Sequence, residues 1–325
     1  MTEVRICTNR DEWDEYVLEY EGHPLQLWGW GQVKQGHGWV SERLFIEDED
    51  AIIGAAQVLI RRLPSPFRSF AYIPRGPICA VEHTGVVLGA ITERVKRVHK
   101  SVALSVEPDT EAFEAPDGWV RSTNKILSPE TILLDITKSE SDLLAAMSKK
   151  TRQYIRKSSA DVTIRQARSE DDLSSCLNLY KKTAQRAGFN LHSDAYYQDV
   201  VAHLRDHSPI FIAEHGGVPV AFLWLAISAD TAYELYGGMN EDGQSLRANY
   251  ALKWYAIRKV KEWGLSRYDF GGLVAGGVTT FKQGWASGET VLAGTFDRPL
   301  SPLYTLWAKG LPFAKKTLQK VRRRG

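Results

Sequence analysis

The chain has 325 residues, of which 43% are hydrophobic and 25% charged, a composition typical of a folded globular protein large enough for two domains. A formal net charge of +2 excludes a protein that binds polyanions over its whole surface. The sequence has no apolar run that would span a membrane, no secretory signal and no cysteine pattern for zinc or disulfides, so we expect a cytoplasmic protein without a metal.

The first half of the chain predicts one α/β unit when its elements are taken in order. Residues 3–20 predict a short strand followed by a helix, with Thr8 as the helix cap. Residues 44–60 predict a strand, a turn of acidic residues and a second strand. A helix over 86–99 and a strand that ends at Glu107 complete the unit.

The second half repeats this plan at an offset of about 160 residues. It begins with a strand and a helix capped by Ser169. Residues 210–226 align with the first strand pair without a gap and predict the same strand, turn and strand. A helix over 246–263, with Lys253 off its apolar stripe, then leads to the strand of RYDFGG (267–272).

This order of elements resembles the acyltransferase fold of the GNAT superfamily. We predict an α/β (α+β) protein of two tandem GNAT-like domains related by duplication. The first domain is expected to span residues 1–138 and the second 139–295, because a new helix cap at Ser139 follows the strand TILLDIT. The last segment, 296–325, is expected to dock as a helix on the first domain and complete it, since a terminal helix is ordered only where it packs.

Ordinary GNAT members hold the pyrophosphate of acetyl-CoA on a glycine-containing loop at the start of a helix, where backbone N–H groups face the phosphates. In the second half this stretch reads QSLRAN (244–249), and Arg247 stands where glycine would be expected. The first half offers only Gly85 in the matching region. An acyl-CoA donor is therefore disfavoured, and an N-acyltransferase that uses a CoA thioester stays as the alternative enzyme.

Seven segments give the chain a more specific resemblance. They are, in chain order, LWGWGQVKQ (27–35), LPSPFRSFAYIPRGP (63–77), SKKTRQYIRKS (148–158), YKKTAQRAGF (180–189), ELYGGM (234–239), RYDFGG (267–272) and GVTTFKQGW (277–285). Their order and spacing resemble the FemABX peptidoglycan aminoacyltransferases over nearly the whole chain, and YIPRGP with the late FK is the most specific pair. The large members carry a coiled-coil arm, and no heptad stretch of that kind is present, so we expect a compact member.

This resemblance implies that an aminoacyl-tRNA is the donor and that no other cofactor is required. The acceptor would be the side-chain amine of the third residue in the stem peptide of a peptidoglycan precursor, either UDP-MurNAc-pentapeptide or lipid II. The reaction would build the interpeptide bridge of the cell wall. A non-catalytic RNA-binding module is the alternative of a different class, suggested by clustered basic residues and many aromatic ones.

The resemblance also assigns roles to individual residues. Lys282 matches the family's late lysine, whose ammonium would face the developing oxyanion or the tRNA end; a surface lysine after a strand is the alternative. Phe281 beside it is either a core residue or a platform on which an adenine stacks. Lys34 and Arg186 match residues that would hold the pyrophosphate of the acceptor.

Further candidate residues follow from the same resemblance. Tyr236 matches a tyrosine that hydrogen-bonds the acceptor, and Tyr197, or its neighbour Tyr196, would supply a second hydroxyl. Glu107 stands where family members can carry an aspartate. It would accept the proton of the amine or, as we favour, only neutralise Arg75 of the PRGP turn, which would shape the wall of the cleft.

A cluster of basic residues lies on the helix predicted after the domain boundary. Arg152 and Arg156 are four residues apart and Lys149 precedes Arg152 by three, so one helical face is positive and could meet tRNA phosphates together with Lys150. The last segment of the chain combines apolar and basic residues and could touch the inner face of an anionic membrane. In both cases a solvated helix face is the alternative.

Overall fold

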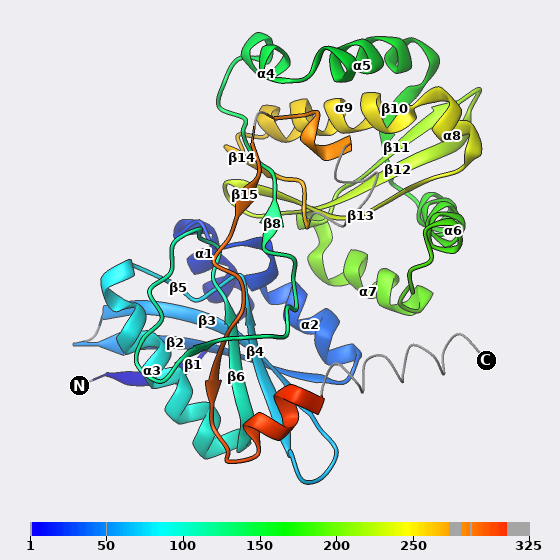
Figure 1. Cartoon of the computed structure of the whole chain (residues 1–325). Helices are drawn as coiled ribbons and strands as arrows, with labels where there is room; N and C mark the ends of the chain where they lie inside the picture. The colour runs from blue at the N-terminus through cyan, green and yellow to red at the C-terminus, as the bar shows by residue number, and fades with distance from the viewer. Residues whose placement is uncertain (1, 50, 273–280, 287, 311–325) are drawn as a thin grey trace. The chain divides into compact units, whose positions relative to one another are not determined.

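The computed structural model describes residues 2–49, 51–272, 281–286 and 288–310. The chain divides into two compact units (Figure 1). Unit 1 contains residues 1–129 and resumes at residue 291, whereas unit 2 spans residues 130–290. Each unit is a mixed sheet with helices against it, and each is described by itself below.

Unit 1 is built on an eight-stranded sheet. Its elements are β1 (Glu3–Ile6), α1 (Arg10–Glu19), η1 (Pro24–Gln26), α2 (Trp28–Gly36), β2 (Trp39–Asp48), β3 (Ala51–Arg62), β4 (Ser69–Pro74), β5 (Ile78–Cys79), η2 (Val81–His83), α3 (Thr84–Arg94), the π-helical turn η3 (Val95–His99), β6 (Ser101–Glu107), β7 (Val120–Arg121) and β16 (Phe296–Pro299). The strands lie in the order β1-β2-β3-β4-β6-β16-β7, with β5 beside β3. Over these residues β4 and β6 run parallel and the other neighbours antiparallel.

Alternation along β3 places helices on both faces of this sheet. Val58 and Ile60 pack in the core with the apolar side chains of α3. Gln57 points the other way, and its Nε2 donates to the carbonyls of Leu25 (3.2 Å) and Leu27 (3.1 Å), at the start of α2. The period of two therefore puts α2 and α3 on opposite faces.

Unit 2 is built on a six-stranded sheet. Its elements are β9 (Leu133–Asp135), α4 (Glu140–Ala146), α5 (Lys149–Asp161), β10 (Thr163–Gln166), α6 (Glu170–Ala187), α7 (Asp194–Leu204), η4 (Arg205–His207), β11 (Ile210–His215), β12 (Val218–Ile227), β13 (Thr231–Met239), α8 (Glu241–Leu246), α9 (Ala248–Glu262) and β14 (Arg267–Asp269). The strands lie in the order β10-β11-β12-β13-β14-β9. Two short strands, β8 (Glu130–Thr131) and β15 (Thr290–Val291), form a separate ribbon.

The second sheet repeats the order of the first, including a parallel pair, β13 with β14, at the matching position. Along β12, Ala221 and Leu223 pack in the core with α9. Phe222 and Trp224 point to the tyrosines of α6 and α7 on the opposite face. Figure 1 shows α5 and α9 together on one side of this sheet and α6 on the other. The predicted α/β fold of two tandem GNAT-like units is confirmed.

Local signals in the sequence set most helix ends. Ser169 caps α6 in a capping box, as predicted. In unit 1 the cap is Asn9, not Thr8, because its side chain accepts the first free N–H groups of α1. The helix predicted over 246–263 is interrupted at Arg247, whose φ of 55° is left-handed and ends α8 before α9 begins.

The structure places the boundary between the units earlier than residue 138. The strand before Ser139 pairs with β14, so that Asp135 lies opposite Arg267 in the second sheet. Unit 2 therefore begins at Glu130, and unit 1 resumes at 291 rather than at 296. A short edge strand carries no local signal for the sheet that it joins, because its partner is distant in the sequence.

The C-terminal segment returns to unit 1 over the part that the structure describes. β16 pairs antiparallel with β6. The helical residues 304–310 follow, and the ring of Trp307 stacks on Phe70 with 4.9 Å between centroids. The predicted docking on the first domain is confirmed, while the basic residues of 311–325 lie outside the described residues. None of the helices described is both long and apolar enough to cross a membrane.

Candidate active site

The parallel strands of unit 2 separate into a cleft. β13 and β14 pair only as far as Tyr233 and Asp269, after which β14 ends and β13 continues to Met239. In unit 1 the matching strands stay paired up to their last residues, Pro74 and Glu107. Unit 2 is therefore the unit whose central parallel strands part before the longer one ends.

The cleft encloses about 390 Å³ and receives side chains from both faces of the sheet. Four residues predicted from the sequence line it, although they are far apart in the chain: Arg186, Tyr236, Phe281 and Lys282. The other polar or charged side chains in its wall are Tyr180, Thr183, Tyr233, Glu234, Asn249 and Lys253. This convergence of charged and aromatic groups marks it as the candidate active site.

Lys282 is buried in the cleft, with 8% of its surface exposed. Its Nζ donates to the carbonyls of Phe270, Gly271 (3.1 Å) and Gly272 (3.0 Å), so the three N–H groups of the ammonium face three oxygens. Burial lowers the pKa of Lys282, while the negative charges of Glu234 and Asp269 act in the opposite direction. Lys282 is therefore a fixed internal cation, and the alternative of a surface lysine is wrong.

A second buried lysine was missed by the sequence analysis. Lys253 is 5% exposed, and its Nζ forms an ion pair with Oε1 of Glu234, which also accepts a hydrogen bond of 2.7 Å from the hydroxyl of Tyr268. Burial lowers the pKa of Lys253 to about 8 against the opposing effect of Glu234. The available signal was spacing, since Lys253 follows Tyr250 by three positions and precedes Ile257 by four, on one helical face.

Aromatic rings enclose these charges. The Nζ of Lys253 lies 4.5 Å from the ring centroid of Phe270 and 5.3 Å from that of Phe281. Phe281 also packs edge-on against Tyr250, with 4.8 Å between centroids, and is partly buried against the core of unit 2. It is therefore a core residue that also forms a wall of the cleft.

Tyr236 stands in a cluster of aromatic side chains. Its ring packs against Tyr197 at 5.2 Å and Trp224 at 5.4 Å, and its hydroxyl is hydrogen-bonded to that of Tyr196. Burial raises the pKa of Tyr236 well above its usual value, so it is a neutral donor. The hydroxyl of Tyr197 instead accepts from the N–H of His192 at 3.2 Å. Tyr196 is therefore the one whose hydroxyl meets Tyr236, and Tyr197 packs its ring on Tyr236. Neither is among the described residues that line the cleft, so a second hydroxyl for the acceptor stays a prediction.

Arg186 is fixed at the mouth of the cleft. Its Nη1 and Nη2 donate to the carbonyl of Met239 at 3.3 and 3.2 Å. With the amide of Gln244 oriented by its hydrogen bonds, the oxygen accepts from Nε at 2.8 Å and from Nη2 at 3.0 Å. The side chain remains exposed, so a positive charge with most of its N–H groups already engaged stands where β13 ends.

Comparison with known proteins identifies the family of the chain. Two family models match, the FemAB family over residues 8–114 and an acetyltransferase (GNAT) domain over residues 145–283. A lipid II:glycine glycyltransferase of Staphylococcus haemolyticus (strain JCSC1435) is 21% identical over 98% of this chain and 99% of its own length. The chain belongs to the FemABX family. This confirms the family predicted from the motifs, and it makes the chain an acyl- or aminoacyltransferase.

Another relative of this FemABX member, and solved structures of other proteins with a similar fold, agree with this family. The lipid II:glycine glycyltransferase of Staphylococcus aureus (strain USA300) is 20% identical over 98% of this chain and 99% of its own length. The alignment runs over 416 positions, so that relative contains residues that this compact chain lacks. The fold matches the crystal structure of FemX with a TM-score of 0.84, at 19% identity over 94% of this chain and 100% of that one. A tandem GNAT protein from the clavulanic acid pathway matches with 0.55, at 10% identity over 93% and 99%.

Arg247 is engaged within the loop that would hold a CoA pyrophosphate in this FemABX member. Arg247 occupies the left-handed conformation that glycine favours, and its backbone N–H donates to the carbonyl of Gln244 at 3.1 Å. Its guanidinium lies 3.7 Å from the ring centroid of Tyr154. The N–H and the side chain are both engaged within the chain, which agrees with the disfavoured CoA donor.

In unit 1, Glu107 is 1% exposed and has a structural role. Its carboxylate accepts from the hydroxyl of Tyr72, from the N–H groups of residues 126 (3.1 Å) and 127 (3.0 Å), and from the hydroxyl of Thr295 (2.5 Å). Arg75 is buried, and its Nη2 donates to the carbonyl of Ser128 at 3.4 Å. The described residues contain no ion pair between Arg75 and Glu107, so the predicted proton acceptor and the predicted neutralising pair are both replaced by a loop anchor.

Lys34 projects from α2, which a close approach holds to the sheet. At Gly31 a Cβ would lie 2.1 Å from Oε1 of Gln57, so a larger residue does not fit. The Nζ of Lys34 lies 4.2 Å from the ring centroid of Trp30, and burial, then Arg61, lowers its pKa to about 8. Lys34 belongs to unit 1 and Arg186 to unit 2, so their joint clamp on the acceptor stays a prediction.

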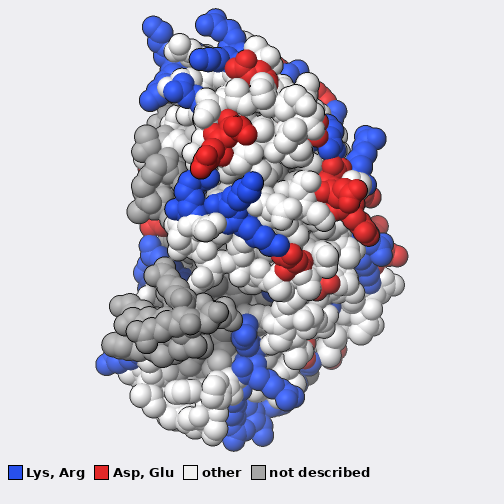
Figure 2. Space-filling model, turned by 90° about the vertical axis from the view of Figure 1, so that its right-hand side faces the viewer, with Lys and Arg blue, Asp and Glu red and all other residues white. Residues whose placement is uncertain are grey.

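The basic helix α5 is only partly available to tRNA. Nη1 of Arg152 donates to the carbonyls of Leu144 (3.1 Å) and Met147 (2.5 Å), at the end of α4, so this arginine caps a helix rather than facing phosphate. Lys149, Lys150 and Arg156 are exposed. Figure 2 shows Lys and Arg side chains gathered at the top, the end at which Figure 1 places α4 and α5. Their contact with tRNA stays a prediction.

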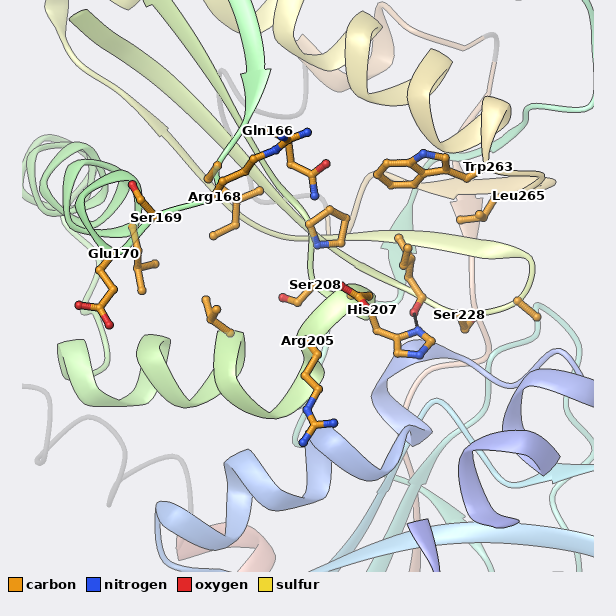
Figure 3. A pocket seen from close by; sticks show the side chains of 18 residues that line it. Gln166, Arg168, Ser169, Glu170, Arg205, His207, Ser208, Ser228, Trp263 and Leu265 are labelled. Atoms are coloured by element: carbon orange, nitrogen blue, oxygen red, sulfur yellow. Dashed lines mark hydrogen bonds between the residues drawn. The ribbon is translucent and has the colours of Figure 1, made fainter. Parts of the chain in front are cut away.

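A larger hollow of about 820 Å³ lies at another edge of the second sheet (Figure 3). His207 shares a hydrogen bond of 3.1 Å with the carbonyl of Ile227, and the hydroxyl of Ser208 accepts from Trp224 at 2.6 Å. Figure 3 shows Arg205 pointing away from the ring of Trp263. Of the described residues that line this hollow, none is a predicted site residue, so the cleft remains the candidate. No group of three or more His, Cys, Asp or Glu in the described part of the chain could hold a metal.

Proposed function

We propose that this protein transfers an aminoacyl group from aminoacyl-tRNA to an amine of a peptidoglycan precursor. The observation that carries the proposal is the cleft between β13 and β14, where the buried ammonium of Lys282 stands beside the ion pair of Glu234 and Lys253. Relatives that span the whole chain are named as lipid II:glycine glycyltransferases, which supports a cell-wall acceptor.

The chemistry requires little beyond positioning and charge. The ester that joins an amino acid to the ribose of tRNA is already activated. The acceptor nitrogen attacks its carbonyl carbon, a C–N bond forms, the C–O bond to the ribose breaks, and the proton lost by the amine ends on the ribose oxygen. A site for this reaction must align amine and ester and stabilise the oxyanion between the two steps.

The residues of the cleft suit these tasks. The ammonium of Lys282 is held by three carbonyls, so its charge is fixed in place where a developing oxyanion would be stabilised. Tyr236 is a neutral hydrogen-bond donor at the same cleft. Arg186 at the mouth would attract the phosphates of the acceptor through its positive charge, since its Nε, Nη1 and Nη2 are already held by Met239 and Gln244. Lys34 would contribute a point charge from unit 1.

The acceptor and the location are part of the proposal. Lipid II and UDP-MurNAc-pentapeptide share the stem peptide and the pyrophosphate that Arg186 would bind, so both are candidate acceptors. A protein that uses lipid II works at the inner face of the membrane, and we propose a cytoplasmic enzyme that touches this face peripherally.

The test is a transfer assay with total aminoacylated tRNA and either precursor, read by product mass. We expect a mass increase of one aminoacyl residue that disappears after ribonuclease treatment. Acetyl-CoA and other acyl-CoA donors, offered without tRNA, are the control and should give no product. Robust transfer from an acyl-CoA would replace this proposal with an N-acyltransferase, and tRNA binding without transfer would indicate an RNA-binding protein.

A further inference from the structure

Two buried lysines share one cleft wall with a single hydrogen-bonded ion pair. Glu234 of β13 binds Lys253 of α9 directly, and the hydroxyl of Tyr268 donates to the same carboxylate oxygen. Lys282 is hydrogen-bonded to carbonyl oxygens, and no ion pair among the described residues includes it. Its charge is therefore balanced through space rather than by contact.

Charged groups from three elements face Lys282. They are Glu234 of β13, Asp269 of β14 and Lys253 of α9. Oδ1 of Asp269 accepts from the hydroxyl of Thr131 (2.5 Å) and from the N–H of Gly271 (2.8 Å), which fixes this carboxylate at the turn after β14. Glu234 is the carboxylate that links the two lysines, because it forms an ion pair with Lys253 and its negative charge also acts on Lys282.

A buried ammonium is costly unless a negative charge or oxygen ligands compensate for it. Three carbonyl dipoles stabilise Lys282, and a neighbouring cation in the same cleft opposes them. If Glu234 were neutral, Lys253 and Lys282 would repel each other among the rings of Phe270 and Phe281. The structure thus couples the charge of Lys282 to both members of the ion pair.

We propose that Glu234 and Lys253 are positioning residues: their buried ion pair keeps Lys282 a cation and so holds the charge that the transfer reaction uses. The role in catalysis depends on the function proposed above. The coupling of the three charges does not, and it can be measured in the protein alone.

The coupling predicts shifts of opposite sign. Glu234→Gln removes a negative charge near Lys282 and disfavours its ammonium, so the pKa of Lys282 falls. Lys253→Met removes a positive charge and leaves Glu234 to Lys282 alone, so the pKa of Lys282 rises. An opposite charge within a few ångströms typically shifts a pKa by about 1–3 units, so we expect about one unit in each direction. A general loosening of the cleft would move both variants the same way.

The measurement is an NMR titration of protein labelled with [ε-¹³C]lysine between pH 6 and 11. Lys282→Met and Lys253→Met assign the two resonances. Lys259→Met is the control, because Lys259 lies on the same helix but does not line the cleft and pairs with Glu262 at 2.8 Å. Lys259→Met should leave the pKa of Lys282 within about 0.3 unit of its value in the unsubstituted protein.

Activity gives the second readout. The alkaline limb of the pH profile of kcat should move down in Glu234→Gln and up in Lys253→Met, in step with the NMR values. If Glu234→Gln does not fold, Glu234→Asp and Lys253→Met decide the matter, and the aspartate variant should keep the pKa of Lys282 within about half a unit of its original value.

If the pKa of Lys282 shifts in the same direction in Glu234→Gln and Lys253→Met, or does not shift in either, the coupling is overturned. Shifts of opposite sign without tRNA-dependent transfer would leave the coupling intact and refute the proposed function. Transfer that depends on tRNA, together with an unchanged pKa of Lys282 in both variants, would support the proposed function and refute the coupling. The two proposals can therefore fail separately.

Discussion

Replacing Lys282 by methionine tests the site most directly. The substitution keeps much of the apolar stem but removes the donors to the carbonyls of Phe270, Gly271 and Gly272. A hydrogen bond with an ionised partner contributes about 1.5–3 kcal/mol. Because the cleft opens to solvent, water can hydrate part of what is lost, and we expect the free energy of unfolding to fall by about 2–4 kcal/mol in total. For a unit of this size that lowers Tm by roughly 5–10 °C.

The catalytic loss should be larger than this structural cost implies. Removing one hydrogen-bond donor or one nearby charge from a developing oxyanion typically slows the reaction roughly 100-fold or more. We expect that decrease in single-turnover transfer at a temperature at which Lys282→Met is folded. Binding of the acceptor, measured by calorimetry, should change little, because the ground state has no oxyanion. Lys282→Arg, which keeps the charge but not the shape, is the matched comparison.

Two results would refute this reasoning. A folded Lys282→Met variant with a near-normal single-turnover rate would limit the lysine to holding the loop at residues 270–272. A selective loss of tRNA affinity, with the chemical step intact once the donor is saturating, would move Lys282 from transition-state stabilisation to donor binding.

Three further predictions concern the surroundings of the site. Arg186→Ala should raise the KM for the acceptor by roughly 10-fold with only a small decrease in Tm from its lost hydrogen bonds, whereas Lys182→Ala, an exposed neighbour on α6, should leave the KM unchanged; equal effects on the KM would contradict the clamp. Gly31→Ala should destabilise unit 1 by about 1–3 kcal/mol in urea unfolding, since its Cβ would meet a buried amide oxygen at 2.1 Å, while Gly89→Ala, with open space around it, should be neutral or slightly stabilising. Because the pKa of Lys34 is lowered to about 8, its charge disappears as the pH rises through that value. Acceptor affinity should therefore fall above pH 8 by calorimetry, and Lys34→Arg should abolish that decline.

Much of the candidate site was accessible from the sequence because it lies in short motifs. The ELYGGM and FK segments located Tyr236, Phe281 and Lys282, and the cleft brings all three together. The sequence could not distinguish Tyr196 from Tyr197, since only the packing shows where the hydroxyl of each adjacent tyrosine points. In the structure the hydroxyl of Tyr196 meets Tyr236, and that of Tyr197 meets a backbone N–H.

The roles of the buried charges needed the structure. Glu107 was placed correctly at the end of a strand, but three of its donors belong to residues 126, 127 and 295. Lys253 was placed off the apolar stripe of its helix because such a stripe distinguishes apolar from polar residues. It does not reveal a polar residue whose partner, Glu234, comes from a distant strand.

Short sequence patterns were enough to predict the local elements and their repetition. Hydrophobic periodicity, caps such as Ser169 and the turn glycines act over a few residues, so they can be recognised without a partner. The folded chain was needed to show which sheet the strand at 133–135 joins, where β13 and β14 part, and that Lys282 is held by three carbonyls. These features depend on contacts between residues far apart in the chain, and their energies come from burial and pairing that no single segment contains.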